Sequence, residues 1–144
     1  MTRILFVCTG NTCRSPMAEA ILRSMGISGV EVKSAGVYAQ DGSDASEHTR
    51  TVLAEEGIDM DHQASMINEN LVNWTSLILT MTESHKDAVT RMFPNASGKT
   101  FTLKEFAGNE GDLDIIDPFG GPVEIYRKTF NEMKIAMSEI IKKL

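Results

Sequence analysis

The sequence predicts an α/β protein of three layers, in which a four-stranded parallel sheet is flanked by helices. Short apolar segments typical of buried strands alternate with segments in which apolar residues recur every three or four positions, as on one face of a helix. A chain of 144 residues with 42% hydrophobic residues is long enough to bury one core, and no linker divides it. We therefore expect one domain over residues 1–144, with right-handed crossovers between parallel strands.

The expected elements follow in order along the chain. The wholly apolar run Ile4–Val7 predicts the first strand, and the helical spacing within Ser15–Met25 predicts the first helix. Ser46 and Thr82 are typical N-cap residues, and Gly57 is a typical C-terminal stop. The remaining elements are expected at residues 30–36 (strand), 46–57 (helix), 76–82 (strand), 82–93 (helix) and 99–106 (strand), and from residue 123 onward (a long amphipathic helix).

Composition excludes several classes of function. The net charge of -6 argues against nucleic acid or an anionic membrane as the main partner, because such sites need a clustered basic surface. No segment approaches the ~18 apolar residues that span a membrane, and the N-terminal apolar run is too short for a signal peptide. We expect a cytoplasmic protein. Two cysteines are too few for a secreted disulfide framework, and a close pair in a reducing compartment is typical of catalysis, redox chemistry or metal binding.

Both cysteines lie in the segment VCTGNTCRSP, residues 7–16, which follows the first strand and opens the first helix. A loop at that place presents backbone N–H groups to an anion, and the helix N-terminus adds positive charge. Gly10 permits a turn that side chains would obstruct, and Arg14 offers a planar fork of donors to phosphate oxygens. The predicted phosphate-binding residues are Thr9, Gly10, Asn11, Thr12, Cys13 and Arg14.

The same surroundings favour the thiolate form of Cys8. The spacing C-x5-R closes a loop around one tetrahedral anion, with the sulfur beneath the phosphorus and the Arg14 guanidinium beside its oxygens. This arrangement predicts phosphoryl transfer to sulfur, with the Ser15 hydroxyl hydrogen-bonded to the thiolate. The segment lacks the lysine and second glycine of a nucleotide P-loop, and no ligands stand at a zinc-like spacing from the cysteines. We expect no metal and no cofactor. The alternative to a catalytic loop is that both cysteines are buried core residues.

The sequence resembles the low-molecular-weight protein tyrosine phosphatase family, whose signature V-C-x-G-N-x-C-R-S-P stands here as VCTGNTCRSP. The likeness continues through SAG (34–36), ILTMT and DPFGG (117–121), so it spans nearly the whole chain. The resemblance implies that Cys8 is the nucleophile of a phosphocysteine intermediate and that Arg14 clamps the phosphate. It also implies that Asn11 organises the loop.

By the same resemblance Asp117 is the general acid. Asp117 also lies in a turn-rich stretch between the last strand and the last helix, and its Asp-Pro pair fixes the local backbone. One such carboxylate can protonate the leaving group and later deprotonate a water. Asp114, three residues earlier, is the alternative acid.

The sequence departs from the tyrosine phosphatase pattern at two places, and in this combination it resembles the bacterial protein arginine phosphatases of the family. Thr12 stands where many members that act on phosphotyrosine carry Ile or Leu, and DPFGG stands where those members often present aromatic residues that sandwich a phenyl ring. A threonine hydroxyl and its slimmer wall suit a guanidinium better than an aryl ring. We expect a monomeric phosphatase that acts on phosphoarginine in phosphorylated proteins, with phosphotyrosine as the alternative substrate. Thr12 is expected to be the discriminating residue, and neutral drift at this loop position is the alternative.

Cys13 is expected to capture oxidised Cys8 as a disulfide, which would protect it from irreversible oxidation. The alternative is a small residue that fills space under the loop. The three histidines are expected to be surface or capping residues. Two further functions remain as alternatives: an arsenate reductase, which would need additional cysteines outside the loop, and a non-catalytic phosphate-binding or redox-sensing module.

Overall fold

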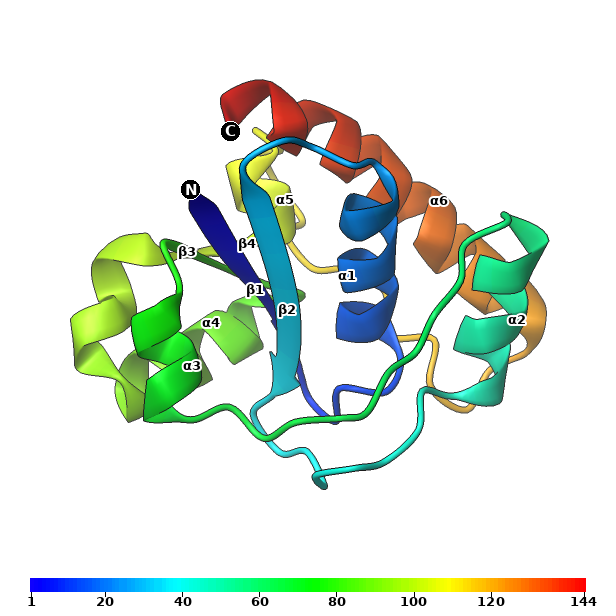
Figure 1. Cartoon of the computed structure of the whole chain (residues 1–144), viewed down its shortest axis with the longest axis horizontal. Helices are drawn as coiled ribbons and strands as arrows, with labels where there is room; N and C mark the ends of the chain where they lie inside the picture. The colour runs from blue at the N-terminus through cyan, green and yellow to red at the C-terminus, as the bar shows by residue number, and fades with distance from the viewer.

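The computed structural model describes all 144 residues and has three layers, in which a four-stranded parallel sheet lies between two layers of helices (Figure 1). Its strands lie in the order β2-β1-β3-β4, and every neighbouring pair is parallel. The predicted fold class is confirmed. The strands are β1 (Thr2–Cys8), β2 (Val30–Gly36), β3 (Leu77–Thr80) and β4 (Thr100–Thr102).

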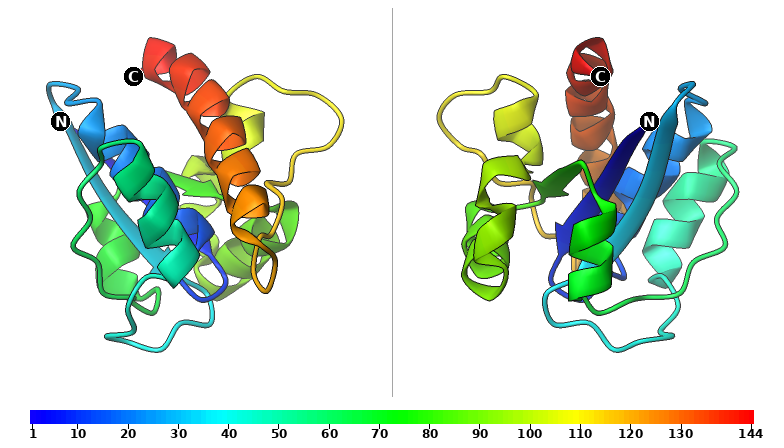
Figure 2. Two further views of the ribbon diagram at one scale, coloured as in Figure 1. Left: turned by 90° about the vertical axis from the view of Figure 1, so that its right-hand side faces the viewer. Right: turned by 60° about the vertical axis from the view of Figure 1, so that its left-hand side comes forward.

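The sheet separates two groups of helices, which Figure 2 shows on either side of the strands. On one face α1, α2 and α6 pack against one another, and α5 joins them through α6; on the other face lie α3, α4 and the 3-10 turn η1. None of these helices is both long and apolar enough to cross a membrane. Their bounds are α1 (Arg14–Ser24), α2 (Glu47–Glu55), α3 (Glu69–Trp74), α4 (Glu83–Met92), η1 (Pro94–Lys99), α5 (Leu103–Phe106), α6 (Val123–Ile140) and a closing turn η2 (Ile141–Lys143).

Strand β1 connects the two cores. Its side chains alternate between the faces of the sheet. Ile4 and Phe6 join the larger apolar cluster under α1 and α6, whereas Leu5 and Val7 join the smaller cluster under α3 and α4. Because β1 is covered on both faces and paired on both edges, its carboxyl end at Cys8 is firmly placed.

Most of the predicted elements are confirmed. The second strand has the predicted bounds, and the side chains of Ser46 and Thr82 cap α2 and α4 as expected. The predicted strand over residues 99–106 is wrong beyond Thr102, whose side chain accepts from the backbone N–H of Glu105 and begins α5 in a reciprocal capping box. Helix α3 was not predicted, because six residues are too few to show a helical period.

Gly36 ends β2 directly against the loop that follows β1. A Cβ placed on Gly36 would overlap the carbonyl oxygen of Thr9 and lie 3.0 Å from the backbone nitrogen of Asn11 and 2.9 Å from the Cβ of Ala39. Contacts this short with backbone atoms cannot be relieved by a side-chain rotation. Glycine at the end of the SAG segment is therefore a packing requirement of the loop.

We predict that Gly36→Ala destabilises the protein by about 1–3 kcal/mol, the usual cost of overpacking, and weakens the binding of inorganic phosphate. Thermal unfolding and phosphate titration measure the two effects. Gly98→Ala is the matched control, because nothing lies within 4 Å of a Cβ at that position. Equal melting temperatures for the two variants would contradict the prediction.

Candidate active site

The loop between β1 and α1 is held by its carbonyl groups. The carbonyl oxygens of residues 8, 9, 11, 12 and 13 each accept a hydrogen bond. The donors, in that order, are the backbone N–H groups of Val37 and Tyr38, Nε2 of His62, and the backbone N–H groups of Ser46 and Met17. By contrast, the backbone N–H groups of residues 9–14 donate to no other group of the protein. A short loop with its donors free at a helix N-terminus is a binding site for a tetrahedral anion.

Asn11 fixes the bend of this loop. Its backbone is in the left-handed region, with a φ of 56°, which asparagine tolerates better than most residues. The side chain is fully buried. Its amide nitrogen donates to the hydroxyls of Ser15 at 2.8 Å and Ser34 at 2.9 Å, and its amide oxygen accepts from the backbone N–H of Ser65 at 2.8 Å. The predicted loop organiser thus connects the loop with α1, β2 and the segment before α3.

Cys8 lies at the floor of the loop, at the carboxyl end of β1, with 3% of its surface exposed. Its sulfur is 2.8 Å from the hydroxyl oxygen of Ser15. Because that oxygen already accepts a hydrogen bond from the amide N–H of Asn11, its own hydrogen is available to the sulfur. The only other acceptor in reach, the carbonyl of Ala35, is farther away at 3.5 Å. The Ser15 hydroxyl is therefore placed to donate to Cys8.

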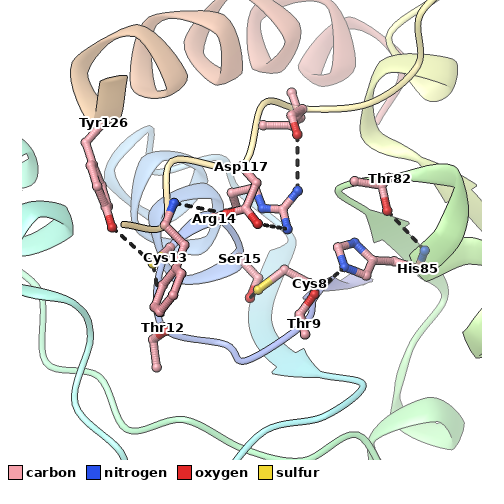
Figure 3. Close-up of polar contacts among 12 residues, drawn as sticks. Cys8, Thr9, Thr12, Cys13, Arg14, Ser15, Thr82, His85, Asp117 and Tyr126 are labelled. Atoms are coloured by element: carbon pink, nitrogen blue, oxygen red, sulfur yellow. Dashed lines mark hydrogen bonds and ion pairs between the residues drawn. The ribbon is translucent and has the colours of Figure 1, made fainter. Parts of the chain in front are cut away.

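Arg14 is buried and held between the loop and the segment before α6 (Figure 3). One guanidinium nitrogen donates to the carbonyl of Ile115 at 3.1 Å, and another lies 3.6 Å from a carboxylate oxygen of Asp117. These groups surround a cavity of about 230 Å³, which has room for a phosphate and part of a leaving group. Its walls are Cys8, Thr9, Gly10, Thr12, Cys13, Arg14, Asp117 and Phe119.

The two candidate acids differ in position. The carboxylate of Asp117 lines the cavity, and one of its oxygens accepts from the backbone N–H of Phe119 at 3.0 Å. Asp114 is not part of the cavity wall, and its carboxylate accepts from the backbone N–H of Glu83 at the start of α4, at 2.9 Å. This geometry favours Asp117, whose side chain is 59% exposed and open to a substrate.

Phe119 was missed in the sequence. Its side chain is 78% exposed, and it lines the cavity two residues beyond Asp117. The segment DPFGG therefore does supply an aromatic wall, and it differs less from the tyrosine phosphatase pattern than the sequence comparison assumed. The signal that could have found it is its position in the same turn as the predicted acid.

Two of the three histidines are not the surface or capping residues that we predicted. Nε2 of His62 donates to the carbonyl of Asn11 at 2.8 Å. His85 is buried, and its Nε2 lies 2.8 Å from the hydroxyl of Thr9. Only His48, half-buried with its ring edge-on to Tyr126, stays outside the loop contacts. These pairings join residues 51 and 76 positions apart, which no local pattern reveals.

Cys13 is buried beneath the loop as a free thiol. Its sulfur lies 3.6 Å from the hydroxyl of Tyr126 and 3.8 Å from that of Thr12. Burial, together with the contact to Cys13, raises the pKa of Tyr126 to about 12, so this hydroxyl keeps its proton. These contacts fit a space-filling residue, and a disulfide with Cys8 stays a prediction. No three His, Cys, Asp or Glu side chains gather as a set of metal ligands.

The chain is similar to known phosphatases over nearly its whole length. The model of the family described as low molecular weight phosphotyrosine protein phosphatase matches residues 3–144. Two proteins named protein-arginine-phosphatase are similar: that of Geobacillus stearothermophilus is 51% identical, covering 99% of this chain and 95% of its own, and that of Bacillus subtilis is 42% identical, covering 98% and 95%. A solved YwlE arginine phosphatase mutant with a phosphorylated active-site serine is 40% identical, with a TM-score of 0.94 over 99% of this chain and 95% of that one.

We predict that Asn11→Ala weakens the binding of inorganic phosphate by about tenfold or more. The three hydrogen bonds that tie the loop to α1, β2 and the segment before α3 are lost together, and a left-handed backbone is left with a less tolerant residue. Phosphate titration by calorimetry measures the effect. Asn131→Ala, on the exposed face of α6, is the control. If both variants bound phosphate like the unmodified protein, Asn11 would not hold the loop.

Proposed function

The chain belongs to the low molecular weight phosphotyrosine protein phosphatase family, and we propose that it hydrolyses phosphoarginine in proteins. One observation carries the proposal: Cys8, Arg14, Asp117 and Thr12 line one cavity, around a loop whose N–H groups are free. The two similar proteins named protein-arginine-phosphatase support it at 51% and 42% identity over nearly the full length. The proposal includes a single domain over residues 1–144 that acts as a cytoplasmic monomer.

In the first step the phosphoryl oxygens accept hydrogen bonds from the loop N–H groups and from the guanidinium of Arg14. The thiolate of Cys8 attacks the phosphorus as the bond from phosphorus to the leaving nitrogen breaks. Asp117, protonated at this stage, gives its proton to that nitrogen, so arginine leaves in its ordinary form. The product is a phosphocysteine.

In the second step Asp117, now a carboxylate, takes a proton from a water whose oxygen attacks the phosphorus. The bond from sulfur to phosphorus breaks, inorganic phosphate leaves, and the thiolate of Cys8 accepts a hydrogen bond from Ser15, 2.8 Å away. The phosphorylated serine of the similar arginine phosphatase mutant supports a covalent intermediate in an active site of this architecture.

The choice of substrate depends on the leaving group. Phosphoarginine presents several N–H donors, which require acceptors. The hydroxyl of Thr12 and the carboxyl oxygen of Asp117 that carries no proton are acceptors in the cavity wall. Phosphotyrosine presents an apolar ring, for which the exposed face of Phe119 is the suitable surface. Phe119 thus favours phosphotyrosine as the second candidate substrate, although the same ring can also stack on a guanidinium.

Replacing the proposed acid tests whether Asp117 protonates the leaving group. We predict that Asp117→Ala lowers kcat/KM, which reports the departure of the leaving group, by about 100- to 10,000-fold for phosphoarginine, the usual contribution of general acid catalysis. It should lower kcat/KM far less for p-nitrophenyl phosphate, whose leaving group needs no proton. Asp114→Ala, the matched control, keeps its activity on both substrates because Asp114 only contacts the start of α4. Equal losses for both substrates in Asp117→Ala would point to another acid.

Replacing the discriminating threonine tests the substrate. On one peptide scaffold, the unmodified protein is expected to have a higher kcat/KM for phosphoarginine than for phosphotyrosine. Thr12→Ile should lower that ratio by about tenfold or more, because a polar contact to the guanidinium is lost and an apolar wall for the ring is gained. Thr51→Ile, on an exposed position of α2, is the control. An unchanged ratio in Thr12→Ile would remove this residue from the discrimination.

A further inference from the structure

A buried histidine contacts the loop at the residue that follows Cys8. His85 lies in the first turn of α4, where 6% of its surface is exposed, and its Nε2 is 2.8 Å from the hydroxyl oxygen of Thr9 (Figure 3). Thr9 lines the same cavity as Thr12 and Asp117. The imidazole thus reaches the cavity wall through one threonine.

The imidazole of His85 is neutral at physiological pH. Its burial is the main cause that lowers the pKa of His85 to about 4, and the nearby charge of Arg14 adds to this, while the carboxylates of Asp114 and Asp117 act in the opposite direction. A neutral imidazole has one N–H donor and one bare acceptor nitrogen. The direction of the hydrogen bond to Thr9 therefore depends on which nitrogen carries the proton.

The other ring nitrogen settles this direction. Nδ1 of His85 is buried and has no hydrogen-bond partner. A buried N–H without an acceptor is rarer in folded proteins than a buried acceptor without a donor. The proton is therefore on Nε2, which donates to the hydroxyl oxygen of Thr9. That hydroxyl keeps one lone pair and its own hydrogen for groups inside the cavity.

We propose that Thr9 is a second substrate-discriminating residue, whose hydroxyl accepts a hydrogen bond from the guanidinium of phosphoarginine, and that His85 is its positioning residue. This inference rests on the proposed function. Rigid guanidinium N–H donors match a hydroxyl held in one orientation. An aryl ring has no donor for it, so an aryl substrate would displace water from the Thr9 hydroxyl without replacing the hydrogen bond.

The first experiment changes Thr9 and measures kcat/KM for one peptide that carries either phosphoarginine or phosphotyrosine. Thr9→Val keeps the shape and removes the hydroxyl, so kcat/KM for phosphoarginine should fall about tenfold, while the value for phosphotyrosine should not fall, because the aryl ring makes no hydrogen bond to that hydroxyl. Thr9→Ser keeps the hydroxyl and should retain most of the preference. Thr90→Val, on the last turns of the same helix as His85, is the control.

The second experiment changes His85. His85→Leu removes the donor and should lower the preference for phosphoarginine as Thr9→Val does. His85→Gln can place an amide N–H near the position of Nε2 and should restore much of it. In a Thr9→Val background, His85→Leu should change the preference no further, because the two residues act as one unit. Nitrogen NMR of the unmodified protein should show the proton of His85 on Nε2 at neutral pH.

The outcomes separate the inference from the proposed function. Equal losses for both substrates in Thr9→Val, or no loss for either, would overturn the inference, and so would a His85 proton on Nδ1. If His85→Leu does not fold, Thr9→Val still decides the question. The unmodified protein tests the proposed function: a preference for phosphotyrosine there would overturn that function together with the inference. A phosphoarginine preference that Thr9→Val leaves unchanged would overturn the inference alone.

Discussion

The site depends on one constraint: the carbonyl groups of the loop after β1 are bonded by neighbouring segments, so its N–H groups stay free. A flexible loop of this length would satisfy its own donors or turn them to water. Here residues 37, 38, 46 and 62 each donate to a loop carbonyl. The carbonyl of Cys13, the last in the loop, accepts from the backbone N–H of Met17 in the first turn of α1. The binding of an anion is therefore prepared by groups that never touch the anion. These free N–H groups also explain how a protein of net charge -6 can hold a phosphate with one buried arginine.

Two residues have restricted conformations or side chains because of that arrangement. Asn11 takes a left-handed backbone that glycine would take more easily, yet glycine would lose the three hydrogen bonds of the amide. Gly36 has no side chain because the loop backbone occupies its place. The loop is thus bent by one residue and given room by another, which lies on the neighbouring strand opposite Cys8. The motif segments VCTGNTCRSP and SAG, far apart in the sequence, are two sides of one contact.

How much the sequence could predict follows from the range of each interaction. Strand β1 and helix α6 have strong apolar patterns, and the caps at Ser46 and Thr82 depend on bonds within a few residues, so local reasoning found them. The loop residues 8–15 were predicted because strand, loop and helix are contiguous. The contacts of His62 and His85 were not, because a histidine far along the chain gives no local sign that it will meet the loop. Likewise the residue types alone did not separate the carboxylates of Asp114 and Asp117, and only the family resemblance favoured Asp117. The structure adds that Asp114 accepts a hydrogen bond from the backbone N–H of Glu83 at the start of α4.

Some groups of the cavity wall would contact either substrate in the same way, and others would contact only one of them. Phe119 can stack on a planar guanidinium and also on a phenyl ring, so an aromatic wall alone does not exclude either phosphoarginine or phosphotyrosine. In the proposed mechanism the loop N–H groups and Arg14 contact the phosphoryl group, which both substrates share. Discrimination under the proposed function must therefore come from hydroxyl and carboxylate groups around the leaving group. A site that accepts hydrogen bonds from its substrate rejects a substrate that cannot donate them, because the acceptors lose their water and are left unpaired. The two threonines of this wall meet that requirement only if their hydroxyls are oriented, and a rotating hydroxyl would adapt to either substrate. The fixed contact between Thr9 and a buried imidazole is the feature of the structure that supplies such an orientation.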